Sequence, residues 1–353
     1  MNRDLGLGLG TAGYGTHLAT WLASRGHAVT FFASRLHGAI PAGVEVVRLP
    51  AVEGGVAGSV RLAQCVRSLP FGRFEVTHAL DRVPGCDVYR AGGGAHGAWL
   101  AQRGGWVRAL RPRERVALRL EAEAAGTARI VVANSVMAAH DLRRHLAIPR
   151  DRIRVVRNGV DADRFAPSRR WWSEFRRAWG VQPDGRVVSF IGHDFERKGL
   201  GVAFSAFEAV CGAPDRFVVC GGARRASRWR RRLCDPRVVW CGATAHPERV
   251  LAATDALCVP TLYDAAANTT LEALATGVPV VTSQFDGSAE VVPEPDWIVR
   301  DPRAVQEVVY SLRRALSAVE SQRRSCVEVG RRWPVSRNGV VMEQIYKELA
   351  DDR

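Results

Sequence analysis

The chain has 353 residues, of which 47% are apolar and 24% charged, and its formal net charge at pH 7 is +14. This composition can bury ordinary cores, so it excludes a chain that is disordered by composition. No apolar run reaches the roughly 18 residues of a membrane-spanning helix, and MNRDLGLGLGTAGYG lacks the apolar core of a signal peptide. The positive charge favours an anionic partner: nucleotide, phosphorylated glycan, anionic membrane or nucleic acid.

The first half of the chain alternates helix-like and strand-like stretches. Residues 16–25 (THLATWLASR) are typical of a helix that ends at Gly26, and residues 27–34 (HAVTFFAS) follow as a strand. The apolar runs 130–133 (IVVA) and 153–156 (IRVV) predict two further strands.

A glycine-rich loop precedes the first of these helices and spells G-x-G-x-x-G from Gly8 to Gly13. A dinucleotide site would also need a preceding strand and an acid about 20 residues on. The second strand ends instead in Ala33-Ser34-Arg35, so we interpret the loop as a phosphate-binding or closely packed turn. The first strand is either a degraded stretch at residues 5–9 or lies upstream of the recorded start, and we favour the second interpretation.

The second half repeats the alternation. Helical stretches such as 247–254 (PERVLAAT) lie between strands predicted at 187–191 (VVSFI), 217–220 (FVVC), 238–241 (VVWC), 256–260 (ALCVP) and 278–282 (VPVVT). Apolar strands separated by helices are typical of parallel sheets covered on both faces. We therefore predict an α/β protein with two doubly wound domains and a break between residues 149 and 167.

The eight cysteines are scattered and form no C-x-x-C pair, which fits neither a zinc site nor a small disulfide scaffold. We expect buried free thiols in a reducing compartment, and hence a cytoplasmic location. Nearly all of the positive charge is arginine, and lysine occurs only at Lys198 and Lys347.

Asp161 and Asp163 spell D-x-D, a pattern that can hold a divalent metal through oxygen ligands. They follow Asn158-Gly159, which is a turn signal. We expect them to cap a turn and a helix start, and we predict no metal there.

Arg197 and Lys198 lie in GHDFERKG, the loop after the strand at 187–191. Open α/β sheets bind ligands at the carboxyl ends of their strands. The pair is suited to neutralising a diphosphate, with a solvated surface pair as the alternative.

The stretch YDAAANTTLEALATG carries two acids, Asp264 and Glu272, separated by seven uncharged residues. We predict a loop, a helix from 268 to 276, and a stop at Gly277. Thr269 to Glu272 fits a capping box, which would make Glu272 structural. Alternatively, the helix N-terminus binds an anion, and the two carboxylates bracket a phosphate ester and accept sugar hydroxyls, as a nucleotide sugar would require.

Together, RNGVDADRF, FERKG and YDAAANTTLEALATGVPVVTS resemble the retaining glycosyltransferases of family 4, and GHDFERKGL and PGCDVYRAGGGAH are similar to lipopolysaccharide core glucosyltransferases. The similarity runs from about Gly10 to Pro334. It implies the GT-B fold, with two Rossmann-like domains facing across a cleft. Residues 1–155 would form the acceptor-side domain, 156–335 the nucleotide-sugar domain, and 336–353 a helix that packs back on the first domain.

The resemblance also assigns roles. Arg197 and Lys198 would hold the donor diphosphate, Asp264 would contact the donor sugar, and His96 would be the fourth catalytic candidate, near the acceptor. The donor-binding positions would be Glu272, Ala265, Ala266, Ala267, Asn268, Thr269, Gly192 and Gly13.

The family implies that a hexose moves with retention from a nucleotide diphosphate sugar, here a UDP-sugar, to a glycolipid or polysaccharide such as lipopolysaccharide core. No metal or other cofactor is expected, because the cations and the helix N-terminus would stabilise the departing diphosphate.

In two places the chain departs from the family pattern. Asp264 stands where the family more often has Glu, and Gly92–Gly94 stand where it often has an acid, which makes His96 the main candidate in the first domain. An inactive protein that keeps the fold and binds a nucleotide sugar or a membrane surface is the alternative.

Two basic segments remain. Residues 99–119 (WLAQRGGWVRALRPRERVALR) suit a surface helix on an anionic membrane. The resemblance implies the same, because the corresponding segment of the family interacts with membranes. The protein would then lie peripherally on the inner face of the cytoplasmic membrane. A solvated helix with a buried stripe is the alternative. Residues 224–232 (RRASRWRRR) predict a solvated helix that could extend a basic rim around a phosphate-rich acceptor. No nucleic-acid module is recognisable, so we predict no nucleic-acid partner.

Overall fold

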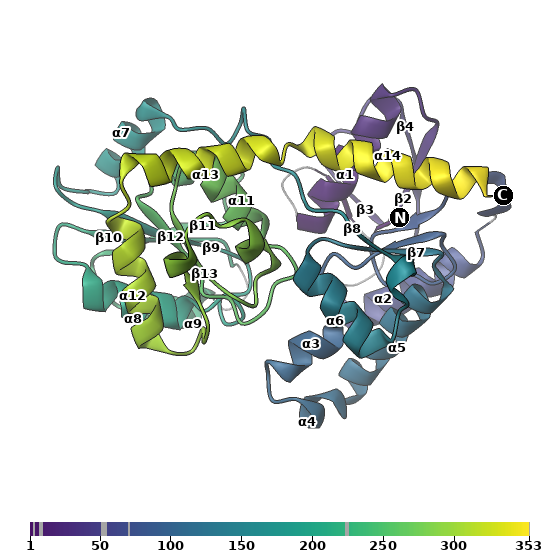
Figure 1. Cartoon of the computed structure of the whole chain (residues 1–353), viewed down its shortest axis with the longest axis horizontal. Helices are drawn as coiled ribbons and strands as arrows, with labels where there is room; N and C mark the ends of the chain where they lie inside the picture. Colours follow the sequence, from purple (N-terminus) through teal and green to yellow (C-terminus); the bar gives the residue numbers. More distant parts are fainter. Residues whose placement is uncertain (3, 7–9, 51–54, 70, 223–225, 353) are drawn as a thin grey trace. The chain divides into compact units, whose positions relative to one another are not determined.

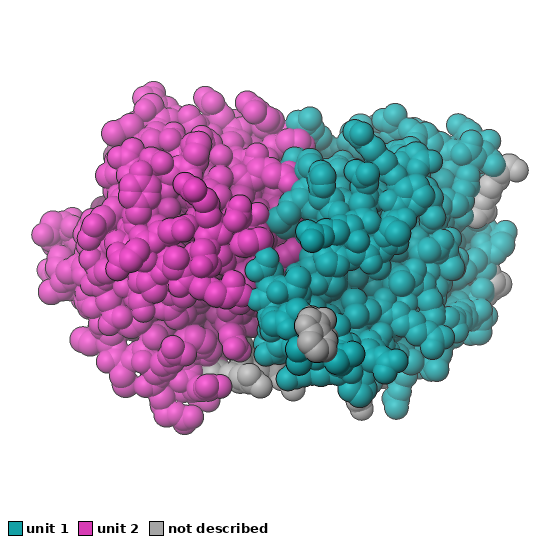
Figure 2. All heavy atoms as spheres, turned by 60° about the horizontal axis from the view of Figure 1, so that its bottom comes forward, with its two compact units in different colours: residues 1–159, 335–353 teal, residues 160–334 magenta. Residues whose placement is uncertain are grey.

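The computed structural model describes residues 1–2, 4–6, 10–50, 55–69, 71–222 and 226–352. The chain divides into two compact units, coloured separately in Figure 2. Unit 1 comprises residues 1–159 and 335–353, and unit 2 comprises residues 160–334. Unit 1 therefore contains both ends of the chain.

Unit 2 is built on a parallel sheet with the strand order β11-β10-β9-β12-β13-β14. All five residues of the central strand β9 are buried, which explains why four of its five side chains are apolar. The five strands predicted for this half are confirmed, with ends shifted by at most two residues. The strands are β9 (Val187–Ile191), β10 (Arg216–Cys220), β11 (Val238–Gly242), β12 (Ala256–Cys258), β13 (Val280–Ser283) and β14 (Ile298–Val299).

Helices cover both faces of this sheet (Figure 1). The helix α8 packs against α12, whereas α11 packs against α13 and α10. The core between the layers includes the fully buried Phe190, Phe207, Phe217 and Trp297. The helices of unit 2 are α7 (Arg169–Ala178), α8 (Leu200–Val210), α9 (Ala226–Arg232), α10 (Pro247–Ala252), α11 (Asn268–Ala275), η3 (Gly287–Val291), η4 (Pro295–Trp297), α12 (Val305–Leu316) and α13 (Glu320–Arg332).

The described residues of unit 1 form three parallel sheets, with the orders β5-β6-β7-β8, β2-β4 and β1-β3. Its strands are β1 (Asp4–Gly6), β2 (Val29–Ala33), β3 (Arg35–His37), β4 (Val44–Arg48), β5 (His78–Ala79), β6 (Val88–Arg90), β7 (Ile130–Ala133) and β8 (Ile153–Val155). Its helices are α1 (Gly10–Ser24), α2 (Gly55–Arg67), η1 (Phe71–Arg73), α3 (His96–Ala101), α4 (Trp106–Ala109), α5 (Pro112–Thr127), α6 (Val136–Leu146), η2 (Arg150–Arg152) and α14 (Val335–Asp351).

The first two residues connect two of these sheets. Asn2 N donates to Phe32 O of β2 at 3.2 Å, and Leu80 N, just after β5, donates to Met1 O at 2.8 Å. The short strand β1 then pairs with β3, so a strand does precede α1. The predicted glycine loop begins at Gly8, and residues 7–9 lie outside the described residues.

The C-terminal helix α14 belongs to the core of unit 1. Its apolar side chains Met342, Ile345 and Leu349 are buried together with Leu18 of α1 and Val132 of β7. Arg129 also donates to the carbonyl of Leu349, and Asn338 donates to that of Arg157.

The predicted single surface helix at 99–119 is wrong, because the segment forms the end of α3, the short α4 and the start of α5. Gly104 and Gly105 adopt positive φ angles of 108° and 62°, which an α-helix does not allow. Pro112 then occupies the first position of α5, where its missing N–H costs no hydrogen bond.

The solvated helix predicted at 224–232 corresponds to α9, which has no buried residue. All eight cysteines are free, and five of them, Cys86, Cys211, Cys220, Cys258 and Cys326, are buried as expected, whereas Cys234 is exposed. Within the described ranges, no helix has both the length and the hydropathy needed to cross a bilayer.

Gly199, which ends FERKG, is required by the backbone. Its φ is +81°, and a Cβ there would lie 2.3 Å from the carbonyl oxygen of Pro260. Gly242 also has a positive φ, +69°, but open space around its Cβ position.

We expect Gly199→Ala to lower the free energy of unfolding by roughly 2–4 kcal/mol and Gly242→Ala by only about 1 kcal/mol. Chemical denaturation of both variants checks this, and equal losses would show that the contact with Pro260 does not matter.

Candidate functional site

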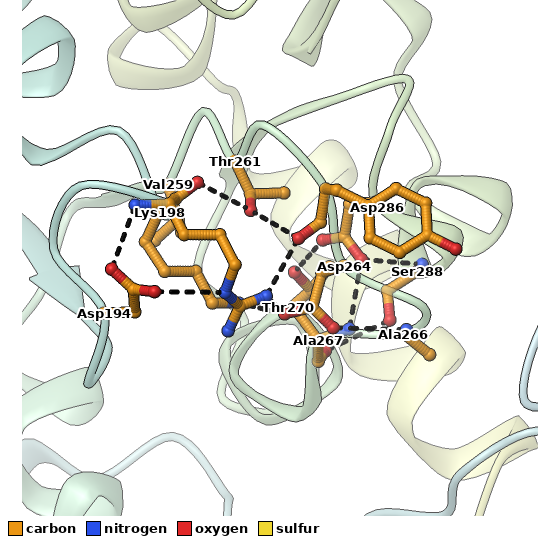
Figure 3. Close-up of polar contacts among 12 residues, drawn as sticks. Asp194, Lys198, Val259, Thr261, Asp264, Ala266, Ala267, Thr270, Asp286 and Ser288 are labelled. Carbon is orange, nitrogen blue, oxygen red and sulfur yellow. Dashed lines mark hydrogen bonds and ion pairs between the residues drawn. The ribbon is translucent and has the colours of Figure 1, made fainter. Parts of the chain in front are cut away.

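The loops after β9 and β12 bring the predicted Arg-Lys pair onto the first predicted acid. Lys198 Nζ lies 2.7 Å from Asp264 Oδ2 (Figure 3). Arg197 Nη1 lies 2.8 Å from the same oxygen. Lys198 is only 6% exposed, so the interpretation as a solvated surface pair is wrong for this residue. Both loops follow the carboxyl ends of neighbouring parallel strands, where α/β sheets bind ligands.

Backbone contacts fix the two loops to each other. Arg197 Nη1 also donates to the carbonyl of Tyr263 at 2.8 Å, and the carbonyl of Arg197 accepts from Leu262 N at 2.8 Å. Gly192 leaves room for the lysine, because a Cβ there would lie 3.1 Å from Lys198 Cγ. The cations are therefore held in position by the fold itself.

Asp264 is a permanently ionised group in this setting. Burial alone would raise the pKa of its carboxyl, but the charges of Lys198 and Arg197 outweigh burial and lower the pKa to about 2. One of its oxygens also accepts from Ala266 N at 3.3 Å. At neutral pH Asp264 is a carboxylate with two cations on one oxygen.

The N-terminus of α11 is organised by Asp286, a residue that the sequence did not single out. The Asp286 carboxylate accepts from Ala267 N at 3.0 Å, Thr270 Oγ1 at 3.0 Å and Ser288 N at 2.9 Å (Figure 3). It also accepts from Thr282 Oγ1 at 2.9 Å. It is 1% exposed, and burial together with the charge of Asp264 raises its pKa. The turn signal Asp286-Gly287 predicts the local bond to Ser288, but not the long-range contacts with α11.

The predicted capping box is wrong. The helix begins at Asn268, its N-cap is Ala267, and no side chain caps it locally. The N–H of Ala267, predicted to be a donor for a ligand, is occupied by Asp286. Thr269 Oγ1 is buried and has no hydrogen-bond partner among the described residues, so it remains available to a ligand. The alanines 265–267 are buried and keep bulky side chains away from the helix start.

Glu272 lies further along α11, and its side chain does not cap the helix. Burial raises the pKa of its carboxyl to about 7, although the charges of Arg164 and Lys198 act in the opposite direction. Within the described part of the chain, no hydrogen-bond donor contacts this carboxylate. A half-buried carboxyl without donors is suited to accepting hydroxyl hydrogen bonds from a ligand.

Two predicted site residues, His96 and Gly13, belong to unit 1. His96 is the first residue of α3, and its Nε2 lies 2.7 Å from Glu114 Oε2 of α5. Its backbone N–H donates to Glu121 at 2.8 Å. Gly13 is buried within α1.

The D-x-D motif caps a turn, as predicted. Asp161 Oδ1 accepts from the backbone N–H groups of Asp163 and Arg164 at 3.2 and 3.0 Å. A helix does not start there. The described side chains include no group of three or more His, Cys, Asp or Glu residues that could hold a metal ion.

Family models match both halves of the chain. The model described as Glycosyltransferase Family 4 matches residues 10–164, and the model described as Glycosyl transferases group 1 matches residues 185–317. The matches include the Arg197, Lys198, Asp264 and Glu272 positions of unit 2.

Individual relatives are more distant. An uncharacterized glycosyltransferase of Methanocaldococcus jannaschii is 26% identical over 179 residues, 48% of this chain and 46% of the relative. The chain thus spans about half the length of that relative. Lipopolysaccharide glucosyltransferase WaaG of Escherichia coli is 23% identical over 320 residues, 85% of this chain and 84% of the relative.

Solved structures share the whole fold. A crystal structure of WaaG, a glycosyltransferase involved in lipopolysaccharide biosynthesis, matches with a TM-score of 0.85 and 18% identity over 98% of both chains. Anabaena HepE in complex with UDP-glucose matches with a TM-score of 0.73 and 17% identity, again over 98% of both. These likenesses show that the chain has the GT-B fold of two Rossmann-like domains, as predicted.

The raised pKa of Glu272 makes stability depend on pH. Between about pH 4.5 and pH 7 the folded protein retains a proton here that the unfolded chain releases, so the free energy of unfolding falls as pH rises. Glu272→Gln carries no such charge. We expect it to exceed the wild type by on the order of 1–3 kcal/mol at about pH 8, and to equal it near pH 4.5.

Chemical denaturation at the two pH values checks this, with Glu174→Gln, an exposed carboxylate of α7, as the matched control. A difference between Glu272→Gln and wild type that is the same at both pH values would contradict burial as the cause.

Proposed function

Because this chain belongs to the family 4 glycosyltransferases, we propose that it transfers a hexose from a nucleotide diphosphate sugar to a glycolipid or polysaccharide acceptor, with retention at the anomeric carbon. We propose a UDP-sugar as donor and lipopolysaccharide core as the kind of acceptor. The WaaG relative, named as a lipopolysaccharide glucosyltransferase, supports the acceptor, and HepE with bound UDP-glucose supports the donor.

The observation that carries the proposal is the cluster of Lys198, Arg197 and Asp264 beside the start of α11. A diphosphate that enters here meets two fixed cations and the positive end of a helix. Negative charge grows on the diphosphate as the bond to the sugar breaks. Groups that are already oriented towards that charge lower the barrier without reorganising during the reaction.

The two carboxylates are proposed to hold the sugars on either side of the diphosphate. Asp264 is ionised and fixed by its cations, so it can accept hydroxyl hydrogen bonds from the transferred hexose. Glu272, which lacks donors of its own, is proposed to accept from the ribose hydroxyls. Ala265, Ala266, Asn268, Thr269, Gly192 and Gly13 remain the further proposed donor-binding positions.

His96 is proposed as the acceptor-side residue of unit 1. Glu114 fixes its imidazole through Nε2, which orients the ring whether or not it moves a proton. We also propose that no metal takes part, because Lys198 and Arg197 supply the charge that would otherwise have to come from a cation cofactor.

Removing the buried lysine tests the proposal. We expect Lys198→Ala to reduce hexose transfer from UDP-glucose by about 10²–10³-fold, because one preorganised charge is lost from the departing diphosphate. The only other lysine, Lys347 of α14, is 62% exposed, and Lys347→Ala should transfer at the wild-type rate. Radiolabelled transfer to purified glycolipid, with and without EDTA, measures both.

Full activity in Lys198→Ala would refute the assigned role. If the wild type itself binds UDP-glucose but turns over no donor, the protein is the inactive binding protein considered as the alternative. Loss of transfer on adding EDTA would contradict the proposal of a metal-free site.

We further propose that α4 and its neighbours contact an anionic membrane surface. Figure 1 shows α4 at the end of unit 1 away from its strands. Val107 and Leu110 are 56% and 62% exposed there. Arg111, Arg113 and Arg115 follow with exposed side chains. Exposed apolar groups flanked by arginines are suited to the headgroup region of an anionic bilayer.

Replacing the two apolar side chains should weaken this contact. We expect Val107→Ser with Leu110→Ser to bind phosphatidylglycerol vesicles about tenfold more weakly, because two side chains no longer leave water. Ile40→Ser is the control, since Ile40 is 49% exposed elsewhere in unit 1. Vesicle sedimentation compares the three proteins, and equal binding by all of them would exclude α4 as the contact.

A further inference from the structure

Unit 1 contains a polar pocket of about 540 Å³, beside the carboxyl ends of β3, β5 and β6. This volume lies within the range of about 300–1,000 Å³ that is usual for small-molecule sites. Its lining includes Arg90, Gly92, Gly93, Gly94 and Glu121. The proposed catalysis uses none of these side chains.

Most charges around this pocket have partners. Arg35 Nε lies 2.8 Å from Asp4 Oδ1, and Arg82 Nε lies 3.3 Å from Glu121 Oε1. Arg90 differs from both arginines. Of the ion pairs between described residues, none involves its guanidinium, although the side chain is only 3% exposed.

Neutral groups surround Arg90. Its Nη2 donates to Asn158 Oδ1 at 2.5 Å, and its guanidinium lies 3.6 Å from the centre of the Tyr14 ring. Its Nε is buried and has no hydrogen-bond partner in the described structure. Burial lowers the pKa of the side chain, which shows that its charge is poorly compensated. A buried charge without a counter-charge is costly, so an anion bound beside this arginine would stabilise it.

The glycine segment leaves space beside this charge. A Cβ at Gly92 would lie 2.4 Å from Arg90 Nη1, so any other residue there would displace the guanidinium. Asn134 Nδ2 donates to the carbonyl of Gly92 at 3.2 Å and holds the segment in place. An anion beside Arg90 would explain why Gly92–Gly94 contain no acid, because a carboxylate there would compete with the anion.

We propose that this pocket binds a phosphorylated sugar, with Arg90 as the phosphate receptor, and hence that the acceptor carries a phosphate group. An arginine can bind a phosphate through two parallel N–H···O bonds. The carboxylates of Asp81 and Glu121, which also line the pocket, suit the hydroxyl groups of the same sugar. The inference rests on the proposed function and names the acceptor class.

The test uses the full chain with UDP at saturation, so that the site of unit 2 is occupied. Glucose 6-phosphate, glucuronate and glucose are titrated, and their binding is followed by calorimetry. We expect glucose 6-phosphate to bind the wild type and glucose to bind at least about tenfold more weakly, because a charged hydrogen bond is lost. Arg90→Gln should lose that preference, Arg90→Lys should keep part of it, and Arg67→Gln, which removes a 61%-exposed charge of α2, should behave as wild type.

The affinity for UDP in each variant reports separately on the proposed donor site and on folding. Equal binding of glucose 6-phosphate by wild type and Arg90→Gln would overturn the inference, as would no binding by the UDP-loaded wild type. Tighter binding of glucuronate than of glucose 6-phosphate would overturn the assignment to phosphate.

Discussion

The candidate site depends on one interaction, the ion cluster in which Lys198 and Arg197 share a single oxygen of Asp264. It joins the loop after β9 to the loop after β12, so it fixes the edge of the sheet at which ligands bind. Burial of Lys198 makes the cluster more than a surface ion pair, because removing either sign would leave a charge unpaired in a dry place. The same cluster presents two cations to a diphosphate. Its cations also keep the Asp264 carboxylate ionised.

Asp286 positions the start of α11 next to this cluster. By binding Ala267 N, Thr270 and Thr282 at once, its carboxylate ties the start of α11 to the end of β13. The helix N-terminus therefore does not depend on a local cap, and Thr269 and Glu272 stay free of structural bonds within the described residues. Unit 1 shows a comparable arrangement around a different group, since neutral side chains hold Arg90 at the end of β6 without a carboxylate.

The sequence predicted the parts of the fold that depend on local pattern. β9 and β13 are buried along their whole length because both faces of the sheet are covered, and Gly277 stops α11 through its positive φ of +79°. The family resemblance and the rule that ligands bind at strand ends placed Asp264 and Lys198 in one site, but neither predicted the ion pair between them. The role of Asp286 was not predictable, because its partners Ala267 and Thr270 lie 19 and 16 residues away along the chain. The break of residues 99–119 into three helices was missed because hydrophobic spacing outweighed Gly104-Gly105 and Pro112 in the prediction.

A crystal structure of the protein with bound UDP would test directly whether the cluster of Lys198, Arg197 and Asp264 binds the diphosphate. We expect electron density for the β-phosphate within hydrogen-bond distance of Lys198 Nζ and next to the first residues of α11, with the ribose hydroxyls on Glu272. Asp264 would then have given up part of its contact with Lys198 to the phosphate. A nucleotide bound elsewhere, for example against the glycine-rich start of α1 and away from Lys198, would show that this cluster is not the diphosphate site.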